Sequence, residues 1–314
     1  MKLLIYIPAF NEEENIGSVI NNLPKNVNNI DIIDILVVDD GSSDNTYDIS
    51  KKYGANVLKH NTNRGVGKAF QSAVEYALEN DIDILVSIDA DGQFNSNQIP
   101  EVIKPLVDNK ADMVTGNRFK QGLPENMPIS KYWGNKQMSR LISLISGQKF
   151  VDVSCGFRAY NREALMRLNL FGNFTYTQET ILDMVYKGLR VIEYPVDVEY
   201  SGIRKSKVVR NVFLYAIKTS KIILDTLRDY KPMAFFGGLA SIFFLLTLLL
   251  ETFVFTFYFA TGDFTPYKVV GLIGLISFIF GLFLGVIGLL GNMINRLRRN
   301  QEEILFLLKK DRYN

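Results

Sequence analysis

Apolar and polar residues alternate along the first part of the chain as they do in strands that are each followed by a helix. Short apolar runs rich in β-branched residues predict strands at 3–10, 33–40, 83–92 and 111–119. Apolar positions at helical spacing predict helices over Glu13–Leu23, Ser43–Tyr53, Gly67–Glu79 and Gln98–Val107. This order predicts an α/β domain with a mainly parallel sheet, in which ligands bind beyond the carboxyl ends of the strands.

Two much longer apolar segments follow. Ala234–Ala260 holds one charged residue, Glu251, and Val269–Ile294 holds none. Each exceeds the roughly 20 residues that cross a bilayer core. The polar turn Thr261–Lys268 separates them, so we predict a transmembrane helical hairpin over residues 232–295. Buried core helices are the alternative, but an uncharged run with six glycines suits lipid better.

The charges around the hairpin predict its orientation. Basic residues are frequent between 204 and 231, and Arg296, Arg298 and Arg299 follow the second span, whereas the turn has only Lys268. The positive-inside rule then places both termini and the N-terminal domain in the cytoplasm. We therefore expect an N-terminal α/β domain at 1–203, a basic amphipathic juxtamembrane segment at 204–231 and a cytoplasmic tail helix at 296–314. The juxtamembrane segment would lie on anionic lipid, or else be an ordinary surface helix.

Composition narrows the chemistry. Apolar residues make up 47% of the chain, which excludes global disorder, and a net charge of +2 gives no sign of a nucleic-acid partner. The single cysteine, Cys155, excludes an intramolecular disulfide and a multi-cysteine zinc site. The single histidine, His60, is interpreted as a loop residue. Catalysis must therefore rest on carboxylates, amides, arginines, lysines and a bound ion.

The central candidate is the pair Asp89 and Asp91, which ends the third predicted strand. Side chains two residues apart on an extended chain point to the same side, so the pair can hold one Mg²⁺ or Mn²⁺ ion. A second pair, Asp39 and Asp40, ends the preceding strand and could accept hydrogen bonds from a base and a ribose. A solvated turn is the plain alternative for one pair, but acids that end two strands favour a site.

Five motifs in order resemble those of family 2 glycosyltransferases with a GT-A fold, of the polyprenyl- or dolichyl-phosphate sugar synthase type. They are IPAFNEEENI, VVDDGSSDNT, DADGQF, GNRF and DVSCGFRAYNREAL, within residues 3–210. The resemblance implies a Rossmann-like GT-A sheet domain, amphipathic interface helices and the membrane hairpin. It also implies inverting, metal-dependent transfer of a sugar from a GDP- or UDP-sugar to a polyprenyl phosphate. The cofactor would be Mg²⁺ or Mn²⁺, and the protein would associate with the bilayer. The resemblance leaves open whether the protein forms a homo-oligomer.

The resemblance further implies roles for single residues. The nucleotide would contact Pro8, Phe10, Asn11, Glu12, Val38, Asp40 and Ala90. The metal and diphosphate would be held by Asp89, Asp91 and Gln93. The phosphates and the acceptor would meet Arg118, Lys131, Ser139, Arg158, Glu179, Arg204 and Lys207. Two alternatives remain: a processive polysaccharide synthase, which should also carry a QxxRW-like motif and more membrane spans, and a non-catalytic membrane-tethered scaffold that binds nucleotide sugars.

Overall fold

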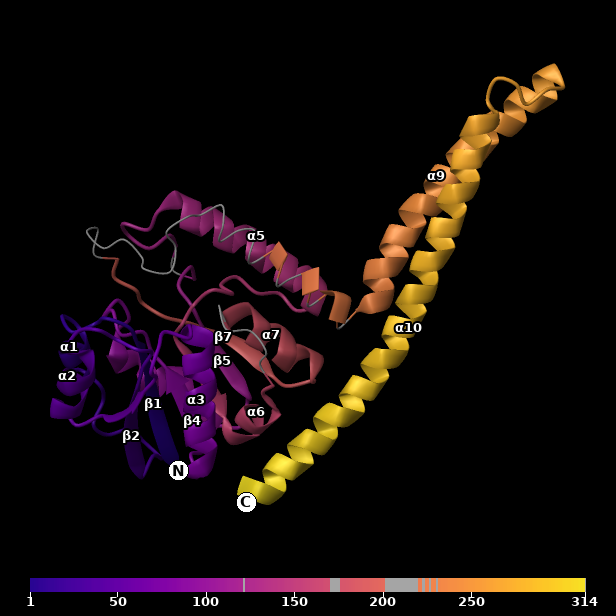
Figure 1. The fold of residues 1–314 in the computed structure, drawn as a ribbon. Helices are drawn as coiled ribbons and strands as arrows, with labels where there is room; N and C mark the ends of the chain where they lie inside the picture. The colour runs from indigo at the N-terminus through magenta and orange to yellow at the C-terminus, as the bar shows by residue number, and fades with distance from the viewer. Residues whose placement is uncertain are drawn as a thin grey trace. The chain divides into compact units, whose positions relative to one another are not determined.

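The computed structural model describes residues 1–120, 122–169, 176–200 and 231–313, and a few residues between 220 and 229. The chain divides into two compact units, Met1–Ala216 with Leu305–Asn314, and Ile217–Ile304. Figure 1 shows the elements of each unit. Arg204 and Lys207, with most of the predicted juxtamembrane segment, lie outside the described residues.

The first unit is built on one seven-stranded sheet with the strand order β3-β2-β1-β4-β6-β5-β7. Its strands are β1 (Lys2–Ala9), β2 (Ile32–Asp39), β3 (Asn56–Lys59), β4 (Ile84–Ser87), β5 (Met113–Asn117), β6 (Arg158–Asn161) and β7 (Val191–Pro195). Only β6 runs antiparallel to its neighbours, β4 and β5. The predicted α/β class with a mainly parallel sheet is therefore confirmed, and so are the four predicted strands; β3, β6 and β7 were not predicted.

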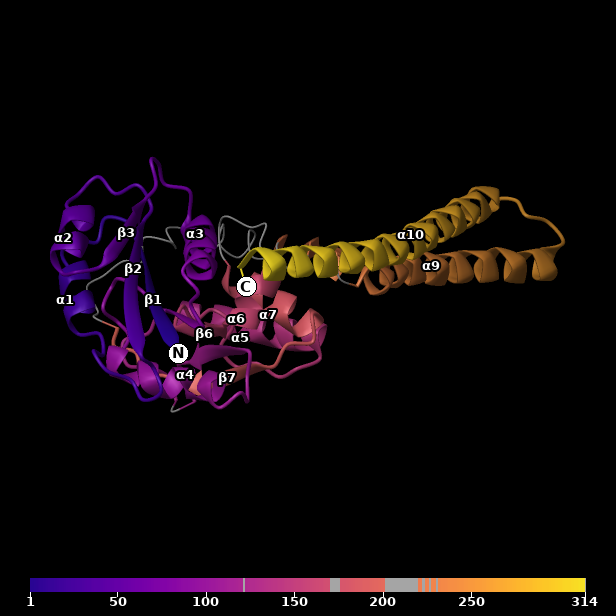
Figure 2. The same cartoon turned by 90° about the horizontal axis from the view of Figure 1, so that it is seen from below.

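Helices cover both faces of this sheet, which explains why β1 is apolar at almost every position. The helices are α1 (Ile16–Asn21), α2 (Thr46–Lys52), α3 (Val66–Glu79), α4 (Ile99–Val107), α5 (Ile129–Ser146), α6 (Arg162–Arg167) and α7 (Thr177–Tyr186). Leu3, Ile5 and Ile7 pack with α1 and α4 in one buried cluster. Tyr6, which points to the other face, meets Phe70 of α3 with ring centroids 6.0 Å apart. Figure 2 shows α3 beside β1 and β2.

The strand register brings the polar clusters to one edge. Ala9 of β1 lies opposite Asp39 of β2, and Tyr6 of β1 lies opposite Ser87 of β4. The segments that follow β1, β2 and β4 therefore leave the sheet at the same carboxyl edge. Because β6 is antiparallel, it enters the sheet there, with Arg158 opposite Ser87.

The second unit holds two helices that are long and apolar enough to cross a membrane. They lie in α9 (Pro232–Thr261) and α10 (Lys268–Tyr313), and the predicted tail at 296–313 continues α10 without a break. Large α9 side chains fit over small α10 residues: Glu251 over Gly274, and Phe244 over Gly281. Hydrogen bonds join the helices as well, since the Ser277 hydroxyl donates to the Phe243 carbonyl at 3.0 Å. Small residues at such an interface let apolar helices pack closely.

Replacement of Gly281 by leucine should therefore separate the hairpin. A Cβ at this position would lie 2.8 Å from the Phe244 ring, so the ring or one of the two helices must shift. We expect a loss of about 1–3 kcal/mol, measured as a lower temperature of heat-induced aggregation in detergent. Gly285→Leu is the matched control, because a Cβ there meets nothing within 4 Å. Equal effects of the two substitutions would contradict this packing.

Candidate active site

The loops after β1 and β2 are tied together by hydrogen bonds. The Asn11 amide N–H donates to the Ser42 hydroxyl at 2.9 Å, and the Asn11 side-chain oxygen accepts from the Ser43 amide at 2.9 Å. Next to them, the Glu12 amide donates to the Thr46 hydroxyl at 2.8 Å. Asn11 has a φ of +55°, a conformation that asparagine tolerates better than most residues. These bonds fix the backbone where the nucleotide is predicted to bind.

Other residues predicted for the nucleotide surround this pair of loops. Phe10 directly follows β1 and is 37% exposed at this edge. Pro8 lies opposite Val38 in the adjacent strand. Val38 and Ala90 are buried, so a ligand would meet them through the backbone at this edge rather than through an open side chain.

The acid pair follows β4 at the centre of the edge. Asp89 and Asp91 are half-buried, and the Gln93 amide donates to Asp91 at 3.1 Å across a turn at Gly92. Burial, and then the charge of Asp91, raises the pKa of Asp89 to about 7. Arg118 and Arg158 act against this rise, whereas Glu12 adds to it. The raised pKa means that ionised Asp89 is poorly solvated in its buried position and is further disfavoured by the neighbouring charge of Asp91.

Two neighbouring carboxylates with a raised pKa fit a divalent cation, whose charge would favour their ionised form. Among the described residues, no group of three or more His, Cys, Asp and Glu side chains is arranged as a complete metal site. Two carboxylates alone suit Mg²⁺ or Mn²⁺, which bind proteins through few carboxylates and share their remaining positions with phosphate oxygens and water. Space for the acids is tight on one side: a Cβ on Gly156 would lie 2.6 Å from Oδ1 of Asp89.

Arg118 acts on Asp89 through its charge, and Asp152 fixes its side chain through hydrogen bonds. Its Nε donates to Asp152 at 2.7 Å and its Nη2 at 2.9 Å, forming a bidentate pair. It also donates to Tyr200 at 2.9 Å and to Ser154 at 2.8 Å. Burial opposes the charge of Arg118, but Asp152 outweighs it and raises the pKa of Arg118 well above the ordinary value. Asp152 and Tyr200 were not predicted as supports of Arg118, because 34 and 82 residues separate them from it.

Lys131 adds a second cation to the same region. It lies in the first turn of α5, with its ammonium group 5.9 Å from the ring centroid of Tyr200. Burial, and then the charge of Arg118, lowers the pKa of Lys131, while Asp91 raises it. The structure thus brings Glu12, Asp89, Asp91, Arg118 and Lys131 within electrostatic reach of one another. Glu179 lies in the first turn of α7 and is half-buried.

Two residues predicted to face the acceptor are buried instead. Ser139 is 3% exposed, and its hydroxyl donates to the Val151 carbonyl at 2.8 Å. Arg158 is fully buried, and it donates to the carbonyls of Cys155 and Val153 at 2.7 and 3.1 Å. Both side chains hold the backbone around residues 150–158, so their predicted role on the acceptor side would be to shape it from within the fold. Arg158 acts on the site through its charge, which lowers the pKa of Asp89.

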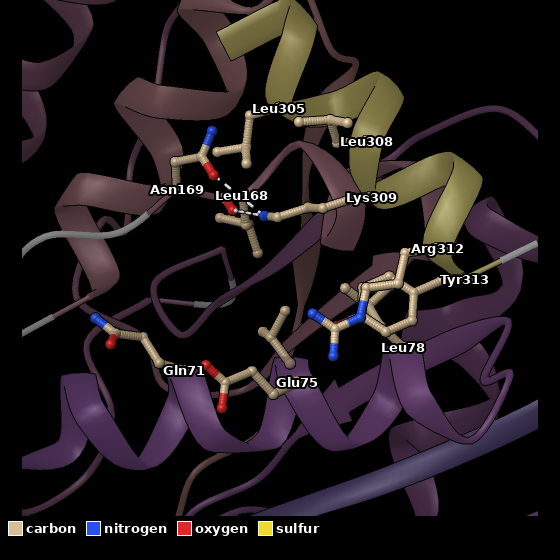
Figure 3. A pocket seen from close by; sticks show the side chains of 11 residues that line it. Gln71, Glu75, Leu78, Leu168, Asn169, Leu305, Leu308, Lys309, Arg312 and Tyr313 are labelled. Atoms are coloured by element: carbon tan, nitrogen blue, oxygen red, sulfur yellow. Dashed lines mark hydrogen bonds between the residues drawn. The ribbon is translucent and has the colours of Figure 1, made fainter. Parts of the chain in front are cut away.

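A separate hollow of about 380 Å³ lies between α3, the end of α6 and the last residues of α10, all in the first unit. Figure 3 shows Lys309 crossing it, where its ammonium group donates to the Leu168 carbonyl at 2.9 Å and to Asn169 at 3.1 Å. Burial lowers the pKa of Lys309. None of the predicted site residues lines this hollow.

Comparison with known proteins agrees with the fold. The chain belongs to glycosyl transferase family 2, which matches residues 4–168, and it is a glycosyltransferase. A UDP-N-acetylglucosamine–dolichyl-phosphate N-acetylglucosaminyltransferase of Methanococcus voltae is 34% identical over 232 residues, which cover 66% of this chain and 91% of the relative. An undecaprenyl-phosphate mannosyltransferase of Micrococcus luteus is 29% identical over 218 residues, which cover 66% and 88%.

A similar fold is found in the glucosyl-3-phosphoglycerate synthase of Mycobacterium tuberculosis, solved with Mn²⁺, UDP and glucosyl-3-phosphoglycerate. The TM-score is 0.55 at 20% identity, and the match covers 72% of this chain and 78% of that chain. The predicted GT-A fold class is confirmed by this likeness together with the sheet.

Proposed function

We propose that this glycosyltransferase moves a sugar from a nucleotide-diphosphate sugar to a polyprenyl phosphate, with inversion at the anomeric carbon and with a divalent cation bound. The observation that carries the proposal is the acid pair Asp89 and Asp91 at the carboxyl edge, where burial and the charge of Asp91 raise the pKa of Asp89 to about 7. Relatives whose names specify dolichyl or undecaprenyl phosphate as acceptor support a lipid phosphate as the second substrate. The donor would be a UDP- or GDP-sugar.

The charge of each site residue suggests which part of the substrates it would bind. Asp89 and Asp91 would hold Mg²⁺ or Mn²⁺, which when bound neutralises charge on the diphosphate leaving group. Lys131 and the remaining N–H donor capacity of Arg118 suit phosphate oxygens on the other side of the acids. Glu179 would lie at the acceptor side. The loops at Asn11 and Glu12 would hold the nucleoside.

The transfer itself needs little proton movement. A phosphate oxygen of the lipid attacks the anomeric carbon while the bond from that carbon to the diphosphate breaks, and the nucleoside diphosphate leaves with the electron pair. A phosphate monoester has a second pKa near 6, so the nucleophile is already ionised at neutral pH. Catalysis would then rest on position and on charge stabilisation rather than on a general base.

The hairpin would hold this site at the lipid surface, where the acceptor phosphate lies. We assign α9 and the apolar part of α10 to two membrane crossings, with the catalytic domain at 1–203 and both termini in the cytoplasm. The arginines at 296, 298 and 299 and the single lysine of the turn support this orientation. The segment at 204–231 would lie on the membrane surface.

The direct test is a panel of nucleotide sugars, incubated with a short polyprenyl phosphate and Mn²⁺ or Mg²⁺ and followed by mass spectrometry of the lipid. One donor should yield a lipid-linked monophosphosugar, and chelation should stop its formation. Failure of every donor, with a folded protein that still binds nucleotide, would favour a non-catalytic scaffold. Release of a polymer would favour a processive synthase.

Asp91→Asn should lower the transfer rate by at least about a hundredfold while leaving membrane insertion intact. The substitution keeps the size of the side chain but removes the charge that would bind the cation. Asp48→Asn on the exposed surface of α2 is the control and should retain activity. Near-normal turnover by Asp91→Asn would count against the proposed site.

A further inference from the structure

Asp40 is a buried carboxylate with several donors around it. It follows β2 at the carboxyl edge and is 5% exposed. Its oxygens accept the backbone N–H groups of Arg64, at 3.0 Å, and of Gly65, at 2.7 Å. Gly65 is the residue before α3, so Asp40 fixes the start of this helix against the end of β2.

The His60 ring provides a third bond to the same carboxylate. Its Nδ1 lies 2.7 Å from Oδ1 of Asp40, and its Nε2 lies 3.0 Å from the Ser72 hydroxyl on α3. Because a carboxylate only accepts, Nδ1 carries the proton and donates; in the neutral ring, Nε2 then accepts from Ser72. The ring is 11% exposed and is held at both nitrogens.

We propose that His60 is a positioning residue of the donor-nucleotide subsite, acting through Asp40. The proposal rests on the function proposed above. His60 holds the Asp40 carboxylate toward Arg64 and Gly65, and thereby keeps the 60–65 loop in place beside the linked loops of β1 and β2. Without this bond, the Asp40 carboxylate keeps only the N–H groups of Arg64 and Gly65, and the side chain at the start of the loop is no longer tied to Asp40.

The place of His60 in the sheet predicts which kinetic constant changes. His60 and Asp40 follow β3 and β2, whereas Asp89 and Asp91 follow β4, and β1 lies between β2 and β4. Loss of the His60 bond should therefore weaken binding of the nucleotide sugar and raise its KM. The kcat value and the KM of the lipid acceptor should remain near those of the wild type.

Two near-isosteric substitutions separate the two ring nitrogens. In His60→Asn, the amide can take the place of Nδ1 and still donate to Asp40; in His60→Gln, the amide reaches the position of Nε2 and loses Asp40. We expect His60→Gln to raise the donor KM by about tenfold, the effect of losing a hydrogen bond to a charged group. His60→Asn should stay within about threefold, and Ser72→Ala should have a small effect.

The experiment measures the Kd of UDP and of GDP, each with Mn²⁺, by calorimetry, together with steady-state transfer and the melting temperature, on the full-length protein. A tenfold weaker Kd for His60→Gln, rescued in His60→Asn at similar melting temperatures, supports the inference. Equal effects of the two variants, a loss in kcat, or an unchanged Kd in His60→Gln would overturn the role of His60 but leave the proposed function intact. A wild-type protein that neither binds these nucleotides nor transfers sugar would overturn the proposed function as well.

Discussion

Asp89→Asn should abolish sugar transfer and yet make the cation-free catalytic unit more stable at pH 8. Transfer fails because asparagine cannot supply the charge that a cation on the diphosphate requires. Stability rises because burial, and then the charge of Asp91, disfavours the ionised carboxylate of Asp89 and raises its pKa to about 7. Asparagine removes that cost, which we expect to be on the order of 2–4 kcal/mol, or roughly 5–10 °C in melting temperature.

The pH dependence of this gain has a definite sign. The folded-state pKa of Asp89, about 7, lies above its ordinary value of 3.8, so the folded protein holds this proton more tightly than the unfolded chain does. The contribution of Asp89 to the free energy of unfolding is therefore present below about pH 4 and is lost as the pH rises to about 7. The advantage of Asp89→Asn should be full at pH 8, less than half as large at pH 5, and absent below pH 4.

Melting curves of the wild type and the variant at these pH values, in the presence of a chelator, measure the effect. Added Mn²⁺ should stabilise the wild type and leave the variant unchanged. Asp83→Asn is the control: Asp83 lies at the opposite end of β4 and accepts the Lys2 amide at 2.7 Å, so its loss should destabilise the protein. A variant of Asp89 that is less stable than the wild type at pH 8 would contradict the charge balance described for the site.

Asp152→Asn should cost about 3–5 kcal/mol in the free energy of unfolding, because it leaves the buried guanidinium of Arg118 without its counter-charge. Asp152 is fully buried, and the side chain of Arg118 is 11% exposed. Since Asp152 also fixes the direction of Arg118, we expect kcat/KM to fall by at least about a hundredfold in the fraction that remains folded.

Asp112→Asn is a matched control for this pair. Asp112 makes a similar bidentate bond to Arg190, at 3.0 and 2.8 Å, but at the amino end of β5 and with Arg190 half exposed. We expect a loss of stability of about 1 kcal/mol and normal activity per folded molecule. Chemical denaturation and steady-state assays at saturating donor measure both variants. Similar results for Asp152→Asn and Asp112→Asn would rule out a special role for the Arg118 pair.

The parts of the fold that could be predicted are those where burial determines the residue type. β1, β2 and β4 are buried on both faces and therefore read as apolar runs. β6 has the sequence Arg-Ala-Tyr-Asn and was missed, because the cost of burying Arg158 is offset by carbonyls that only the folded backbone brings together. β3 was missed because its sequence, Asn-Val-Leu-Lys, has exposed polar residues at both ends and only two apolar residues between them, both half-buried.

The acid pair of the candidate site was predicted because both acids come directly after a strand. The supports of the site could not be predicted in this way. Asp152 and Tyr200 reach Arg118 from distant segments, and the role of His60 depends on β3 ending beside Asp40. Ser139 and Arg158 were assigned to the acceptor side by the family resemblance, whereas the fold buries both and uses them to bind its own backbone.

The position of Gly156 explains why the CGFR part of the fifth sequence motif contains a glycine. The glycine does not have a positive φ, so any residue could adopt its backbone shape; what excludes a side chain is the carboxylate of Asp89, 67 positions earlier in the chain. Even the methyl group of an alanine at position 156 would displace the Asp89 carboxylate. The glycine of the CGFR motif thus leaves room for the Asp89 carboxylate, and we expect it to change only when Asp89 changes as well. Its presence is therefore tied to the donor side of the site rather than to the lipid acceptor.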